Sequence, residues 1–143
     1  MKPIINTITQ DWIDKNNPCP EALDWYKDYL DKEPIMILKR LIKAEKYDWA
    51  NWFIVRVMEY RDYVAYGVYA AESVIDIFKK KYPDDKRLRK AIEATKRCIE
   101  NPSEENKEAA GEAAWAAARA AAWAAGAAMQ LKILNYGMEL IGG

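Results

Sequence analysis

The sequence contains few of the side chains on which catalysis usually depends. None of its 143 residues is histidine, which excludes Ser-His-Asp and Cys-His nucleophilic systems and imidazole acid–base chemistry. Cys19 and Cys98 lie far apart and fit no metal-binding or redox spacing. The acid pairs at 84–85 and 104–105 fall at predicted helix starts, where carboxylates favour the helix dipole. We therefore expect no enzyme, no catalytic residues, no metal site and no cofactor.

One stripe of side chains has the composition of a binding surface. Trp115, Arg119 and Trp123 are spaced at i, i+4 and i+8, so on a helix they share one face. One interpretation buries both indoles in the core and lets the arginine reach outward. The other exposes a Trp-Arg-Trp patch, and tryptophan and arginine are enriched at the centres of protein interfaces. The sequence leaves both open.

A second candidate surface is a run of positive charge over residues 79–97. It holds nine basic residues against three acidic ones, and Arg87, Arg89 and Lys90 lie at its centre. A solvated helix face explains this run, and so does a contact with phosphate or with an acidic protein. No aromatic residues alternate with these charges to stack on bases, so sequence-specific recognition of nucleic acid is disfavoured.

The elements that must position these residues are all predicted to be helical. Residues 1–17 are expected to form an irregular arm. Helices are then predicted to begin near six residues, namely Pro18, Pro34, Asp48, Asp62, Asp84 and Pro102. The fifth helix is expected to face inward with Leu88, Ile92, Thr95 and Ile99. The fold class predicted for 1–143 is all-α, a single-domain bundle of about six helices.

The last predicted helix is long and rich in alanine, and is expected to span residues 102–141. Fourteen of the twenty residues from 109 to 128 are alanine, the strongest helix former. Short side chains allow neighbouring backbones to approach closely. The helix is therefore interpreted as a central rod around which the others pack, with a face for self-association as the alternative.

Charge and targeting signals place further limits on function. Lys plus Arg and Asp plus Glu both total 22, so no net charge draws the chain to nucleic acid or to a membrane surface. The N-terminus lacks a signal-peptide pattern, and residues 113–129 form too short and too weakly apolar a stretch to span a membrane. We expect a cytoplasmic protein with no membrane partner.

Several segments resemble a known family. The runs at 70–78, at 81–87 (Lys-Tyr-Pro-Asp-Asp-Lys-Arg) and at 89–94, followed by the Ala/Trp repeat, are similar to a bacterial and phage-borne family of Ala/Trp-rich immunity proteins. The likeness covers roughly residues 19–130. Leu88 stands where that family usually has proline, and Thr95 where it usually has alanine. The resemblance implies a helical, single-domain inhibitor that occludes a protein partner, and it supplies no catalytic residues.

These observations lead to one functional hypothesis and two alternatives. The hypothesis is a non-enzymatic inhibitor that binds a bacterial effector tightly, either a toxin or, in a phage-borne copy, a host-defence protein such as a CRISPR component. Its expected contacts are one of two groups of residues. The first group is Trp115, Arg119 and Trp123, and the second is Arg87, Arg89 and Lys90. The alternatives are a small nucleic-acid-associated regulator that uses the basic run, and a structural homo-oligomer built on the alanine helix.

Overall fold

The computed structural model describes residues 3–27 and 32–142 of the chain. Inside the helices, the side chains at 74–78, 87–88, 91, 114–115, 117–118 and 120–125 lie outside this description. The described part contains eight α-helices and no β-strand, so the predicted all-α class is confirmed. The helices are α1 (Gln10–Asn16), α2 (Pro20–Lys27), α3 (Pro34–Lys43), α4 (Tyr47–Arg56), α5 (Tyr60–Lys81), α6 (Arg87–Glu100), α7 (Glu104–Ala125) and α8 (Ala127–Leu140).

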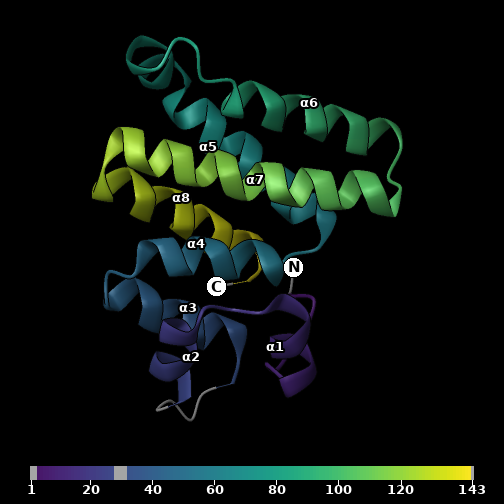
Figure 1. Cartoon of the computed structure of the whole chain (residues 1–143), viewed down its shortest axis with the longest axis vertical. Coiled ribbons are helices and arrows are strands. Elements are labelled where there is room, and N and C mark those ends of the chain that lie inside the picture. The colour runs from purple at the N-terminus through teal and green to yellow at the C-terminus, as the bar shows by residue number, and fades with distance from the viewer. Residues whose placement is uncertain (1–2, 28–31, 143) are drawn as a thin grey trace.

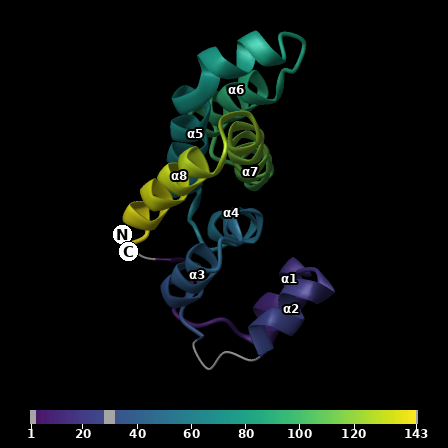
Figure 2. The ribbon, with the colours of Figure 1, turned by 90° about the vertical axis from the view of Figure 1, so that its left-hand side faces the viewer.

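The helices are stacked along the long axis of the molecule, in an order that differs from their order in the chain. α6 lies at one end, α7 and α8 cross the middle, and α4 leads on to α3 and to the short pair α1 and α2 at the other end (Figure 1). α5 packs behind α7, and α7 in turn contacts α6, α4 and α8. Figure 2 shows α1 and α2 set to one side of α3 and α4. α7 therefore packs against four other helices, α4, α5, α6 and α8.

The core forms where α3, α4, α5 and α8 meet. Its fully buried members include Leu38, Ile54, Tyr66, Ile133 and Leu134. The buried residues of α3 (34, 37, 38 and 41) and of α8 (133, 134, 137 and 138) recur at three- and four-residue spacings, which produces an apolar stripe on each of these helices. At the other end, α1 and α2 contain no buried residue. The end that carries α1 and α2 is therefore packed less tightly than the core.

α6 packs on α5 and α7 through small side chains. Ala94 and Cys98 of α6 and Ala110 of α7 are buried, whereas Ile99 is 70% exposed. The prediction that Ile99 faces inward is therefore wrong. The buried row lies one position earlier, because small residues at 94 and 98 permit a close approach that isoleucine would prevent. The Tyr63 hydroxyl of α5 donates to the Lys107 carbonyl oxygen and ties α5 to α7.

The predicted helix over 102–141 is in fact two helices. Gly126 separates α7 from α8 with φ 83° and ψ −177°, a conformation that is essentially restricted to glycine. The start also differs from the prediction, because α7 begins at Glu104. There the Ser103 hydroxyl accepts a hydrogen bond from the Asn106 N–H at 3.2 Å and caps the helix.

The predicted irregular arm over residues 1–17 contains a helix, α1. The Thr9 hydroxyl accepts a hydrogen bond from the Trp12 N–H at 3.1 Å and caps its start, and Asn17 ends it in the left-handed conformation. Two backbone bonds fix the rest of the arm, from the Ile4 N–H to the Val57 oxygen and from the Ile8 N–H to the Lys32 oxygen. The arm is therefore part of the fold.

Two kinds of feature are absent from the described residues. None of the helices there combines the length and the apolar character needed to cross a membrane. Within the same residues, no three Cys, Asp or Glu side chains gather in a way that could hold a metal ion.

Candidate functional site

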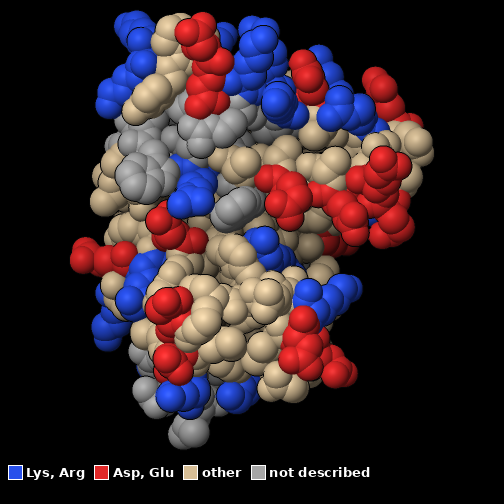
Figure 3. All heavy atoms as spheres, viewed as in Figure 1, with Lys and Arg blue, Asp and Glu red and all other residues tan. Residues whose placement is uncertain are grey.

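The end of the molecule that carries α6 displays a basic surface. We define it by the exposed residues Lys79, Lys80, Lys81, Lys86, Arg89, Lys90, Lys96 and Arg97, from the end of α5 and from α6. Figure 3 shows cations gathered at that end with some acidic side chains among them, and a larger group of acidic side chains over the neighbouring side of the molecule. The acidic residues include Glu104, Glu105, Glu108 and Glu112, all exposed on the first half of α7.

The basic surface places charge against the dipole of α6. The first turn of α6 contains no acidic residue, and its N-cap is Lys86. Cations near a helix N-terminus are unfavourable, because the helix dipole is positive there. The three lysines that end α5 are instead placed favourably. Helix stability alone therefore does not account for the cations at the start of α6.

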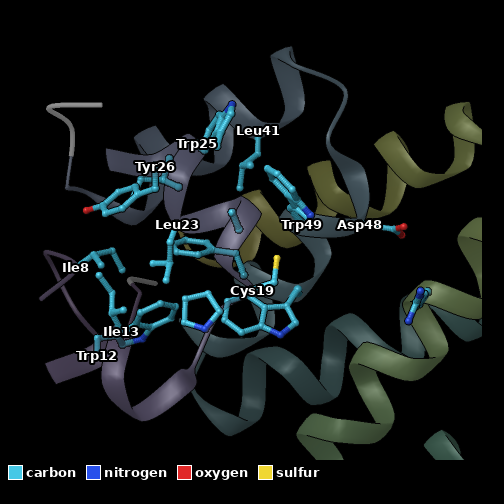
Figure 4. Close-up of a pocket in the computed structure, with 16 residues that line it drawn as sticks. Ile8, Trp12, Ile13, Cys19, Leu23, Trp25, Tyr26, Leu41, Asp48 and Trp49 are labelled. Carbon is cyan, nitrogen blue, oxygen red and sulfur yellow. The ribbon is translucent and has the colours of Figure 1, made fainter. Parts of the chain in front are cut away.

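A second feature, the aromatic cavity, lies between the short helices α1 and α2 on one side and α3, α4 and α7 on the other. It has a volume of about 460 Å³. Six aromatic rings line it, namely Trp12, Trp25, Tyr26, Trp49, Trp52 and Phe53 (Figure 4). Such a volume lies within the range of small-molecule pockets, which are about 300–1,000 Å³.

Five of these six rings form two groups. Trp12 meets Trp52 edge to face at 6.1 Å between centroids and lies 5.4 Å from Phe53. Trp25 meets Trp49 edge to face at 6.3 Å. Edge-to-face pairs at these distances are the preferred geometry of aromatic contacts. Each group therefore has fixed ring orientations, even though α1 and α2 contain no buried residue.

Three cationic side chains lie over the faces of lining rings without lining the cavity themselves. Lys46 Nζ lies 4.3 Å from the centroid of Trp49, and Lys32 Nζ lies 4.4 Å from that of Tyr26. The Arg56 guanidinium lies 4.1 Å from the centroid of Trp52 and donates to the Trp52 carbonyl oxygen at 2.8 Å. Partial burial lowers the pKa of Arg56, and the Glu112 carboxylate of α7 opposes this shift. None of these cations lines the cavity.

The cavity has an apolar floor and a polar mouth. Ile37 and Leu41, each 4% exposed, form part of the floor. Cys19, Asp48 and Arg119 are exposed residues that line the same space and therefore mark its mouth. Figure 4 shows the Asp48 carboxylate at the edge of the cavity, pointing away from the labelled rings.

The structure places the predicted contact residues on separate surfaces. Arg119 lines the aromatic cavity, whereas Arg89 and Lys90 belong to the basic surface on α6, a helix that contributes none of the described lining residues. The side chains of Trp115, Trp123 and Arg87 lie outside the described residues. The stripe on α7 therefore reaches the cavity through Arg119, and the two candidate groups do not form one site.

Sequence reasoning missed the cavity because its rings come from three separate helices, α1, α2 and α4. Trp12, Trp25, Trp49 and Trp52 have no common spacing, and each fits the apolar stripe of its own helix. One signal was available, since four of the six tryptophans fall within residues 12–52. That density exceeds what three short helices need for a core.

Comparison with known proteins gives a family. A model of the DUF6931 family, described as a family of unknown function, matches residues 37–132, more than half of the chain. The chain belongs to the DUF6931 family. No curated protein and no solved structure matches it. The matched segment of this DUF6931 protein runs from α3 into α8, so it includes Asp48 and Arg119 but not α1 and α2.

Proposed function

We propose that this DUF6931 protein is a non-enzymatic binding protein that neutralises a bacterial effector by forming a tight complex. The effector is a toxin or, in a phage-borne copy, a host-defence protein. The observation that carries this proposal is the basic surface, where eight exposed Lys and Arg side chains gather on α5 and α6. We infer that the effector presents an acidic surface to it.

The basic surface lowers the stability of the folded chain, and this supports a role in binding. Like charges that crowd together destabilise the compact state, and those at the start of α6 also oppose its helix dipole. An acidic partner offsets both effects. A concentrated charge also steers the encounter of two proteins and raises the association rate. Exposed hydrophobic side chains beside the charge, above all Ile99 at 70% exposure, supply apolar contact area.

The composition and the resemblance point to the same class of protein. A chain without histidine, and with only five Ser and Thr residues, has little from which to build an enzyme site. The similarity of residues 19–130 to Ala/Trp-rich immunity proteins favours an inhibitor that occludes its target. Cytoplasmic location and the absence of a cofactor are part of the proposal.

A pull-down with matched charge variants tests the proposal. The tagged chain is incubated with nuclease-treated lysate of its source organism, and captured proteins are identified by mass spectrometry. We expect one stoichiometric partner that is lost with Arg89→Glu/Lys90→Glu. Lys39→Glu/Lys43→Glu on α3 is the control, because it reverses two exposed charges by the same amount elsewhere. A partner that both double variants retain equally contradicts the proposed surface.

The same basic surface makes nucleic acid the second candidate partner. Binding through phosphates falls steeply as salt concentration rises. The Lys and Arg side chains of the protein release counterions from the nucleic-acid backbone, and this release is less favourable at high salt. Titration of the chain with duplex DNA and with RNA at several salt concentrations distinguishes the two. Binding of DNA or RNA with that salt dependence, when the pull-down captures no protein partner, favours the regulator, and capture of only the chain itself favours the homo-oligomer.

A further inference from the structure

We propose that the aromatic cavity binds a neutral, planar aromatic molecule with a hydrogen-bond donor and an acceptor on one edge. The proposal does not depend on the function proposed above, because it involves no residue of the basic surface. It rests on the size of the cavity, on its rings, on the charges around the rings and on the two charged residues at its mouth.

The aromatic cavity opens to solvent at its mouth and has the volume of a ligand pocket. An engineered apolar cavity of roughly 150 Å³ already binds benzene, and this cavity measures about 460 Å³. The helices α1 and α2 that cover it have no buried residue of their own. A molecule placed between them and α4 would therefore remove much apolar surface from water.

The rings select for a flat aromatic body. Two edge-to-face pairs line the cavity, Trp12 with Trp52 and Trp25 with Trp49. In each pair, one ring comes from α1 or α2 and the other from α4. Aromatic groups prefer offset-stacked or edge-to-face contacts with such rings. A planar ligand can make these contacts with both pairs, whereas a branched aliphatic molecule cannot.

The charges around the cavity select against a charged ligand. Lys46, Arg56 and Lys32 each lie within 4.5 Å of the centroid of a lining ring. A ring that already attracts one cation offers less attraction to a second, and the three cations repel it directly. An anion has to leave water for an apolar space and to pass the exposed Asp48 carboxylate at the mouth. A neutral molecule meets neither penalty.

The mouth defines the polar edge of the ligand. Asp48 and Arg119 both line the aromatic cavity, and both also line a smaller hollow beside it with Asn51 and Gln130. An ionised carboxylate only accepts hydrogen bonds, and a guanidinium only donates them through its five N–H groups. An edge that carries both a donor and an acceptor, such as a carboxamide, matches this pair.

Three probes of one shape test the chemistry. The full chain is titrated with 2-naphthamide, 2-naphthoate and 2-naphthamidinium, and binding is followed by calorimetry and tryptophan fluorescence. We expect 2-naphthamide to bind at least about tenfold more tightly than either charged probe, because desolvation of a charge is costly. Failure of all three to bind up to about 1 mM, or equal or tighter binding of a charged probe, overturns the proposal.

Two variants locate the binding. Ala22 lines the cavity, so Ala22→Trp fills it and is expected to weaken 2-naphthamide binding more than tenfold. Ala109→Trp adds the same side chain at an exposed position on α7 and is the control. Asp48→Ala changes an exposed residue and is expected to weaken 2-naphthamide and to strengthen 2-naphthoate. Unchanged affinities in a folded Ala22→Trp variant, or in Asp48→Ala, contradict the assignment.

Discussion

The Tyr66 hydroxyl donates a hydrogen bond to the side-chain oxygen of Asn51 at 2.8 Å, inside the core between α5 and α4. Tyr66 is 0% exposed and Asn51 is 7% exposed. Burial raises the pKa of the Tyr66 hydroxyl far above its usual range, so this group is always the donor. The bond fixes the relative position of the two helices, and α4 in turn carries Trp49 and Trp52 of the aromatic cavity.

Removal of this hydroxyl is expected to destabilise the fold. Tyr66→Phe leaves an acceptor of Asn51 without its buried donor, which costs about 1–3 kcal/mol in the free energy of unfolding. Urea denaturation followed by circular dichroism measures this change. Tyr60→Phe is the control, because the Tyr60 hydroxyl takes part in an exposed contact with Arg61. Equal losses in the two variants would mean that the buried bond contributes nothing specific.

A close approach in the core explains why residue 137 is glycine. A methyl group on Gly137 would lie 2.6 Å from Ile54 Cδ1 and 2.7 Å from Tyr66 Cε1. Gly137→Ala is therefore expected to destabilise the protein by about 1–3 kcal/mol through overpacking.

A second glycine provides the matched control for this substitution. A methyl group on Gly111 of α7 would lie 3.7 Å from the Tyr63 ring, an ordinary contact distance. Gly111→Ala gains helix propensity and is expected to stabilise the chain by up to about 1 kcal/mol. Thermal unfolding of both variants measures the difference, and shifts of the same sign contradict the packing described around Gly137.

The sequence predicts the helices well and their junctions less well. Proline at the start of α3 and apolar stripes at three- and four-residue spacing are local signals, so α3, α4 and α5 are found close to their predicted positions. A helix is predicted to begin near Asp48, and α4 begins one residue earlier, at Tyr47, which places Asp48 in its first turn. That shift carries its carboxylate to the mouth of the cavity. A shift of one residue is beyond the resolution of capping signals.

The division of the alanine-rich segment could not be predicted from composition. Alanine on both sides of Gly126 favours one continuous helix. The break becomes necessary only because α8 must turn back to pack Ile133 and Leu134 on α4 and α5. The aromatic cavity is a similar case, because it exists only once five helices are placed around one space. Tertiary packing decides both features, whereas local propensity decides the class of the fold.

The turn at Gly126 requires a backbone conformation that residues other than glycine rarely adopt. Its φ of 83° with ψ of −177° is accessible essentially to glycine alone, and nothing lies within 4 Å of an added methyl group. Gly126→Ala is therefore expected to cost about 1–3 kcal/mol through backbone strain alone. Ala128→Gly, an exposed change within α8, controls for helix propensity and is expected to cost about 1 kcal/mol or less. A Gly126→Ala variant as stable as the native chain would mean that α7 and α8 join as one helix.

A buried carboxylate is expected to make stability depend on pH. Asp62 is 1% exposed, and neither of its carboxylate oxygens has a hydrogen-bond partner among the described residues. Burial raises its pKa above the usual range, and the nearby Glu59 carboxylate raises it further. Between the unfolded pKa of about 3.9 and the raised folded pKa, the native state binds more protons than the unfolded state. Stability therefore falls as pH rises through this window.

Asp62→Asn removes this titration. The difference in unfolding free energy between Asp62→Asn and the native chain is expected to be smallest below about pH 4 and to increase in favour of the variant as pH rises, levelling off above the folded pKa of Asp62. Urea denaturation from pH 3.5 to 8 measures it. Asp14→Asn, an exposed change on α1, controls for the loss of one negative charge. A difference that does not vary with pH, or that varies equally in the control, would mean that Asp62 is charged and solvated in the folded protein.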